Sequence, residues 1–211
     1  MLHMIENIPP QEIEKRSFDI ITSELDCPLD PVLAPIIKRV IHTTADFDYV
    51  DSLYFSPEVV PHALDTLRQG ITLITDTTMA MAGINKRALN ELHCQVECLI
   101  ADEEVAKAAK LNGTTRSREA MIKASKLPGK LGFVIGNAPT ALVALNEMMS
   151  ANTLNPAFII GVPVGFVNVV QSKELIRQSS APCILSMGRK GGSNVAAAIV
   201  NALLYMIVDR K

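Results

Sequence analysis

The stretch "KRVIHTTADFDY" (residues 38–49) places a histidine, His42, three residues after an arginine, Arg39. On a helix these positions lie on one face, so the two side chains would be neighbours. A nearby cation disfavours an imidazolium unless an anion lies between the two groups. The pair therefore suits an anionic ligand beside a histidine that exchanges a proton. Asp46 and Asp48 could orient the imidazole or balance charge, or Asp46 could simply end the helix.

Taken by itself, this stretch favours a surface histidine near a helix end with no chemical role. No serine or cysteine nucleophile accompanies His42, which argues against a hydrolytic triad. If His42 is catalytic, general acid–base catalysis is therefore its natural role.

The segment "GRKGGSN" (residues 188–194) lies between a predicted strand and a predicted helix. Its glycines permit positive φ angles and close backbone approach, and the following helix would add unpaired N–H groups. With Arg189 and Lys190 it predicts a pocket for a carboxylate or a phosphate, although a glycine-rich turn with two solvated cations has the same sequence. The glycine spacing matches neither a Walker loop nor a dinucleotide fingerprint, which disfavours a dinucleotide-binding oxidoreductase.

Two further segments are candidates for the same site. In "TDTTMAMAGINK" (residues 75–86), threonine hydroxyls and Lys86 could line a polar wall, but Asp76 or Thr77 as the cap of a short helix is the favoured interpretation. In "GVPVGF" (residues 161–166), glycine and proline could bring the backbone close to a flat ligand, as they also do in ordinary connections.

The cysteines indicate a protein of a reducing compartment rather than a metal protein. Four cysteines in a chain of 211 residues are typical of reduced thiols in the cytoplasm. In "HCQVEC" (residues 93–98), Cys94 and Cys98 would lie about 13 Å apart on a strand, too far to share one zinc ion. We therefore expect no metal site.

Charge and apolar patterning exclude two classes of partner. A net charge of −2 and a pI near 6.1 provide no basic field for nucleic acid or an anionic membrane. The opening residues "MLHMIENIPPQ" lack a basic segment followed by an apolar core, so no signal peptide is expected. The apolar stretch at residues 195–208 is interrupted by Asn201 and is shorter than the roughly 20 residues that span a bilayer. It predicts a buried helix.

Hydrophobic residues make up 48% of the chain and aromatic residues 4%, which suits an α/β protein with an aliphatic core. Short apolar runs predict strands at residues 71–75, 95–100, 131–136, 157–161 and 182–186. Helices are predicted at residues 10–25, 31–44, 57–69, 103–111, 116–127, 138–151, 166–178 and from 193 or 194 onward.

The alternation over residues 71–211 predicts a three-layer αβα sandwich around a mostly parallel, Rossmann-like sheet. Residues 1–70 are expected to form a helical N-terminal part that caps or flanks the sheet edge, so that residues 1–211 make one domain. Ligands of open α/β sheets bind beyond the carboxyl ends of the strands. The segments expected there are 75–86, 136–141, 161–168 and 186–194.

Six motifs, in order and over essentially the whole chain, carry a specific resemblance. They are "EKRSFDII" (14–21), "RVIHTTADFDY" (39–49), "TDTTMAMAGINK" (75–86), "GNAPTAL" (136–142), "PVGFVNVVQSKE" (163–174) and "GRKGGSNVAAAIVNALL" (188–204). Together they resemble the precorrin-8X or cobalt-precorrin-8 methylmutase family of cobalamin biosynthesis.

The resemblance implies an isomerase that moves a methyl group from carbon 11 to carbon 12 of a corrinoid precursor, giving hydrogenobyrinate or, with cobalt inserted, cobyrinate. It implies no cofactor, a cytoplasmic setting and a homodimer, to which the apolar C-terminal helix could contribute if it is not core. The family's essential histidine falls on His42, which would act as general acid. The family's substrate contacts fall on Ser17 and Arg39. A non-catalytic corrinoid carrier with the same pocket is the alternative.

The expected partner is thus a small-molecule polycarboxylate macrocycle, with no nucleic acid and no membrane. Met79, Met81, Val164 and Phe166 would pack against its ring. The predicted site has His42 as catalytic residue and, for substrate binding, Ser17, Arg39, Thr77, Thr78, Lys86, Arg116, Gly188, Arg189, Lys190, Gly191 and Ser193.

Overall fold

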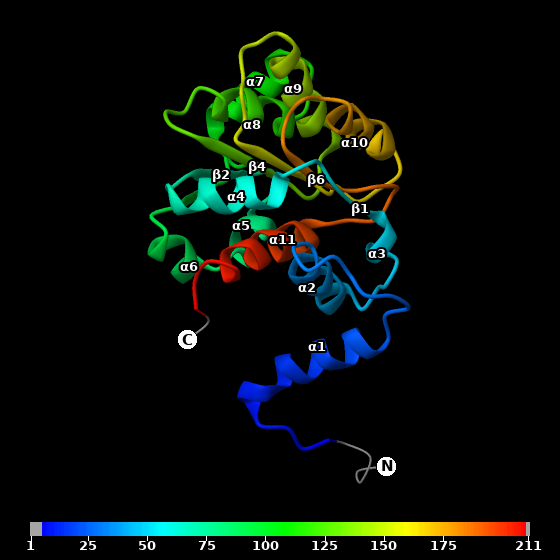
Figure 1. The fold of residues 1–211 in the computed structure, drawn as a ribbon. Coiled ribbons are helices and arrows are strands. Elements are labelled where there is room, and N and C mark those ends of the chain that lie inside the picture. Colours follow the sequence, from blue (N-terminus) through cyan, green and yellow to red (C-terminus); the bar gives the residue numbers. More distant parts are fainter. Residues whose placement is uncertain (1–5, 210–211) are drawn as a thin grey trace.

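A computed structural model describes residues 6–209 of the chain (Figure 1). Residues 1–5 and 210–211 lie outside this description. They include part of the opening stretch considered for a signal peptide and both ends of the predicted domain.

Within the described residues the strands form one six-stranded sheet, in the order β1-β6-β5-β4-β2-β3. The strands are β1 (Leu53–Phe55), β2 (Thr72–Thr75), β3 (Gln95–Glu97), β4 (Leu131–Ile135), β5 (Phe158–Gly161) and β6 (Cys183–Ser186). β2 to β6 are parallel, and β1 pairs with β6 in the antiparallel direction. All five predicted strands are confirmed, although β3 ends at Glu97 and is shorter than expected.

The helices also follow the predicted alternation. A 3₁₀ turn at Pro10–Glu12 precedes α1 (Ile13–Ser23), α2 (Ala34–Thr44), α3 (Tyr49–Ser52) and α4 (Val59–Arg68). They are followed by α5 (Thr78–Gly83), α6 (Lys86–Glu91), α7 (Glu103–Leu111), α8 (Arg116–Ala124), α9 (Pro139–Ser150), α10 (Val169–Arg177) and α11 (Ser193–Tyr205). The predicted helix at residues 166–178 begins only at Val169, because Gly165 and Asn168 both have positive φ angles.

Successive strand residues point into two different cores, which makes the three layers. Leu73 and Val134 pack with α2, α4 and α11 on one face of the sheet, whereas Ile74 and Phe133 pack with α7 to α10 on the other. Figure 1 shows these two helical layers on opposite sides of the strands. The predicted αβα sandwich with a mostly parallel sheet is confirmed.

The N-terminal part joins one of these layers instead of standing apart from it. α2 and α4 lie beside α11, while α1 contacts α2 and extends away from the sheet (Figure 1). β1 was not predicted, and it adds an edge strand within the segment expected to be helical. A three-residue strand is too short to show the alternation by which longer strands are recognised.

The chain changes direction across the sheet between β2 and β4, since β3 lies on one side of β2 and β4 on the other. Ligands of such sheets bind at this switch point. Here Asp76, which is 1% exposed, accepts backbone N–H groups from Gly136 at 2.9 Å, Asn137 at 2.8 Å and Ala138 at 2.6 Å. Burial raises the pKa of this carboxyl above its ordinary value even though backbone N–H groups, these three among them, oppose the shift.

We predict that Asp76→Ala lowers the free energy of unfolding by about 3 kcal/mol or more, because each buried N–H without an acceptor costs about 1–3 kcal/mol. Asp76→Asn keeps one acceptor oxygen and should have a smaller effect. Urea unfolding measures both, with the exposed Asp65→Ala as control. Equal stability of Asp76→Ala and Asp65→Ala would contradict the role given to Asp76.

Candidate functional site

The loops after β2, β5 and β6 are bonded to one another at the carboxyl edge of the sheet. The Gly192 N–H donates to the Val162 carbonyl at 2.8 Å, and the Gly165 N–H donates to the Arg189 carbonyl at 3.1 Å. The hydroxyls of Thr77 and Ser193 lie 2.7 Å apart, at the starts of α5 and α11. Together with the Asp76 bonds to the loop after β4, these contacts bring together all four segments expected at this edge. These four segments are called the edge loops below.

Gly191 allows the loop after β6 to lie against the loop after β5. It has a φ angle of 152°, and a Cβ atom there would lie 2.1 Å from the Val162 oxygen. Gly188 also has a positive φ angle, 75°, but a Cβ there would meet nothing within 4 Å. Of these two glycines, Gly191 is the one that combines a restricted backbone conformation with a close approach.

The sequence of α2 separates a buried apolar face from the face that carries Arg39 and His42. Its apolar residues Ile36, Ile37, Val40 and Ile41 are buried. The other face carries Arg39, half-buried, and His42, exposed in the last turn. The helix ends at Ala45, whose left-handed conformation lets its N–H donate to the Ile41 carbonyl at 2.7 Å.

An aromatic contact from α1 joins Arg39 and His42. The rings of Phe18 and His42 are stacked with centroids 5.4 Å apart. The Arg39 guanidinium lies 4.7 Å from the Phe18 centroid and 5.5 Å from that of Tyr205 on α11, and it forms an ion pair with Glu14. The predicted neighbours thus share one surface, and Arg39 already has an anionic partner.

Lys190 is also paired. Its Nζ lies 2.6 Å from a carboxylate oxygen of Asp46 and 2.6 Å from one of Asp48. These carboxylates raise the pKa of Lys190, and the bond to Lys190 lowers the pKa of Asp46. Asp46 and Asp48 thus connect the end of α2 to the loop at residues 188–192, the glycine-rich loop. They do so by balancing charge, one of the roles considered for them.

The predicted residues of the segment at 75–86 have their contacts within that segment or with Ser193. Thr77 caps α5 by accepting the Ala80 N–H, and Thr78 is exposed beside it. Lys86, at the start of α6, donates to the Met81 carbonyl, and burial lowers the pKa of its ammonium group.

Two predicted residues have weaker links to the edge loops. The Ser17 hydroxyl bonds within α1, to the Ile13 carbonyl at 2.9 Å. Arg116 is exposed at the start of α8, on the opposite helical layer from α2. The structure gives neither residue a bond to the glycine-rich loop.

Exposed apolar side chains surround the edge loops. Met79 is 69% exposed, Phe166 81% and Val167 78%, and the Arg189 guanidinium lies 5.5 Å from the Phe166 centroid. Large apolar residues this exposed are suited to an apolar ligand surface. Val164, also exposed, fits the same description, whereas Met81 is half-buried.

Several residues of this region were not predicted from the sequence, among them Phe18, Tyr205 and Lys173. Phe18 and Tyr205 gave no local signal, since their contacts come from packing between distant helices. Lys173 did give one: with Val169, Ser172 and Ile176 it occupies the buried stripe of α10, where a lysine is unusual.

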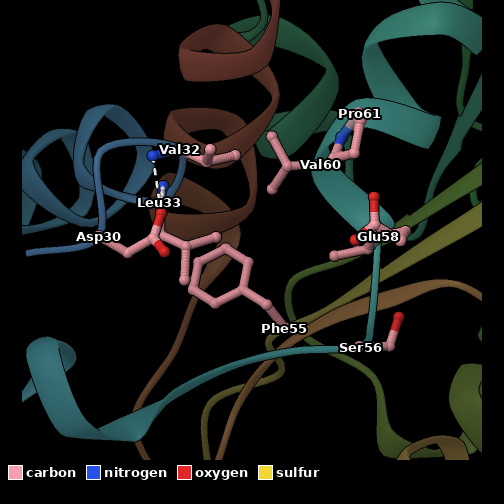
Figure 2. Close-up of a pocket in the computed structure, with 9 residues that line it drawn as sticks. Asp30, Val32, Leu33, Phe55, Ser56, Glu58, Val60 and Pro61 are labelled. Carbon is pink, nitrogen blue, oxygen red and sulfur yellow. Dashed lines mark hydrogen bonds between the residues drawn. The ribbon is translucent and has the colours of Figure 1, made fainter.

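None of the predicted site residues lines the cavity shown in Figure 2. That cavity, of about 290 Å³, lies between the loop before α2 and the connection from β1 to α4. Ser56, one of its lining residues, bonds to the backbone of Cys183 at the amino end of β6, and Asp30 accepts the Val32 N–H. The cavity is therefore at the opposite edge of the sheet from the glycine-rich loop.

A second cavity, of about 450 Å³, does include a predicted residue. It lies between α1, α2 and the end of α11. Its lining residues are Phe18, Pro31, Ala34, Pro35, Lys38, Arg39, Ala202, Tyr205 and Met206.

Residues 6–209 contain neither a metal-binding cluster of side chains nor a membrane-spanning helix. In that range no three or more His, Cys, Asp or Glu side chains are grouped so as to hold a metal ion. No helix there has the length and apolar character needed to cross a bilayer.

The fold and the edge loops define a three-layer α/β protein with a cation-bearing, glycine-rich site at the switch point of its sheet. The family model for precorrin-8X methylmutase matches residues 12–206. The cobalt-precorrin-8 methylmutase of Salmonella typhimurium is 46% identical, over 97% of this chain and 98% of that protein. The precorrin-8X methylmutase of Pseudomonas aeruginosa is 38% identical, over 92% and 94%.

A solved structure agrees with these relatives. That of a precorrin-8X methylmutase from Thermus thermophilus matches with a TM-score of 0.83 at 34% identity, over 92% of this chain and 96% of that one. The chain therefore belongs to the precorrin-8X methylmutase family of cobalamin biosynthesis, and it is an isomerase.

We predict that Gly191→Ala is more destabilising than Gly188→Ala. Both substitutions carry a backbone strain of about 1–3 kcal/mol, but only Gly191→Ala also forces the two loops apart. Chemical unfolding of the two variants measures the difference. Equal losses of stability would show that the contact between Gly191 and Val162 does not constrain the loop.

Proposed function

We propose that this chain moves the methyl group from carbon 11 to carbon 12 of precorrin-8X or cobalt-precorrin-8, with His42 as general acid. The products would be hydrogenobyrinate or cobyrinate. The observation that carries the assignment is the position of His42: an exposed imidazole, stacked on Phe18, in the helix turn that leads to the Asp46–Lys190 pair. These contacts support His42 as a proton donor close to the loops that suit an anionic macrocycle.

The chemistry of the proposed substrate matches the chemistry of these loops. Its acetate and propionate arms are carboxylates, for which Arg39, Arg189 and Lys190 are suitable partners through charge-assisted hydrogen bonds. Its flat ring is apolar, as are the exposed side chains of Met79 and Phe166. A near-neutral protein can thus hold a polyanion by local donors.

Glu14, Asp46 and Asp48 have a defined part in this proposal. They neutralise Arg39 and Lys190 before the substrate arrives, so a substrate carboxylate would exchange one anionic partner for another. Such an exchange avoids the free-energy cost of leaving a half-buried cation without a partner.

The proton of His42 would travel in both directions. As an imidazolium, His42 would protonate a ring nitrogen or a peripheral position and make the ring electron-poor, which promotes methyl migration. Substrate and product are isomers, so the ring must give up a proton after the migration, and neutral His42 would accept it. The reaction is redox-neutral, so the proposal needs no redox cofactor.

Two further parts of the proposal concern the setting of the enzyme. We place it in the cytoplasm, which suits the free thiols of Cys27, Cys94, Cys98 and Cys183. We also propose a homodimer, which would cover the exposed Ile13 and Ile20 on one face of α1. α11 itself is mostly core, since its apolar residues pack against α2 and the sheet.

We predict that His42→Ala lowers kcat by about 10² to 10⁴, the usual loss when a general acid is removed. It should still bind the product, as measured by a shift in the visible spectrum. His93→Asn is the matched control, because His93 is exposed in a turn with a φ angle of 53°, which asparagine tolerates. Wild-type turnover by His42→Ala would exclude the proton-donor role, and a wild type that binds but never converts substrate would favour a corrinoid carrier.

A further inference from the structure

Lys173 is a buried charge that the proposed reaction does not use. It lies on α10 in the stripe formed with Val169, Ser172 and Ile176, and its exposure is 0%. Burying an ammonium group is expensive unless its N–H groups are bonded. Its partners therefore show what it does.

All three partners of the Lys173 ammonium are uncharged oxygens at the base of the glycine-rich loop. Nζ lies 2.9 Å from the Gly188 carbonyl, 2.9 Å from the Lys190 carbonyl and 3.2 Å from the Ser186 hydroxyl. The Ser186 hydroxyl in turn donates to the Lys190 carbonyl at 2.8 Å. Three N–H groups thus meet three acceptors.

These bonds fix the direction in which the carbonyl groups of the loop point. Lys173 binds the carbonyls of Gly188 and Lys190, and the Gly165 N–H binds the carbonyl between them, that of Arg189. Three consecutive carbonyls are therefore held by groups of the protein. A peptide oxygen is the negative end of its dipole, so this arrangement removes repulsion from a carboxylate that approaches the loop.

We propose that Lys173 is a positioning residue, which holds the loop at residues 188–192 in the conformation that receives a substrate carboxylate without touching the substrate. The identity of that ligand as a corrinoid carboxylate rests on the proposed function. The loop conformation itself does not, and it can be measured without any ligand.

The surroundings of Lys173 make its charge sensitive to pH. Burial lowers the pKa of Lys173 from 10.5 to about 8. The titratable or charged side chains of the elements around it are Glu147 of α9, Cys183 of β6, Tyr54 of β1, Arg189 and Lys190 of the loop, and Glu174 and Arg177 of α10 itself. Within the described chain none of these side chains bonds to the ammonium. Three of them have other partners: Glu147 pairs with Arg118, Glu174 with Arg177, and Lys190 with Asp46 and Asp48.

Ligand affinity and stability should then respond to pH in opposite directions. Above a pH of about 8 the amine is neutral and keeps two donors at most, so affinity for a carboxylate falls. Between this pH and 10.5 the unfolded chain holds the proton more often than the folded one, so the contribution of Lys173 to stability rises with pH. A purely structural lysine would change stability without changing affinity.

We predict that Lys173→Met raises KM about tenfold, the effect of losing about 1.4 kcal/mol of carboxylate binding, and changes kcat little. The matched control is Ser172→Ala, a buried neighbour whose hydroxyl bonds only within α10, and it should keep the wild-type KM. Amide NMR signals of Gly188 and Gly191 in the ligand-free protein should titrate with a midpoint near 8 in the wild type and the control. In Lys173→Met this titration should be absent.

An unchanged KM in folded Lys173→Met, or a glycine titration that persists in it, would overturn the inference. If Lys173→Met does not fold, Ser186→Ala takes its place. It removes one acceptor while keeping the buried charge. The inference therefore requires a smaller rise in KM and a shifted midpoint of the glycine titration. If Ser186→Ala shows neither of these two changes, the inference is overturned. Failure of the wild type to bind or convert corrinoids would reject the proposed function, while the ligand-free titration would still test Lys173.

Discussion

The carboxylate of Asp76 holds the crevice on which the site depends. Parallel strands that diverge at a switch point leave unpaired N–H groups where the next helix begins, and here three of them bond to one buried side chain. The loops after β2 and β4 are fixed as a result. Thr77 can then meet Ser193, which aligns the start of α11 with the same edge.

Charge at this edge is balanced locally rather than over the whole protein. Two cations here face carboxylates: Arg39 of α2 faces Glu14, and Lys190 of the glycine-rich loop faces Asp46 and Asp48. The Lys190 pairs are partly exposed and contribute little to stability. They do leave the site with cations already directed to one surface, and this is the property that a polycarboxylate ligand requires.

The sequence predicted the layers, the five parallel strands and the edge where the loops meet, because apolar runs and glycine-rich turns are local signals. It did not predict the stacking of Phe18 on His42 or the bonds of Lys173, which depend on α1 meeting α2 and on α10 meeting β6. Asp76 illustrates the difference. Its position after a strand suggested a helix cap, but its acceptors serve a loop 60 residues away. Only the strand order brings that loop within reach.

The proposed function requires that the chain itself perform the methyl shift. Incubation with precorrin-8X and, separately, cobalt-precorrin-8, each carrying a ¹³C-labelled methyl group on carbon 11, tests this most directly by NMR. The labelled methyl is expected on carbon 12 with at least one of the two substrates. A label that stays on carbon 11 in both, while the visible spectrum shows binding, would contradict it.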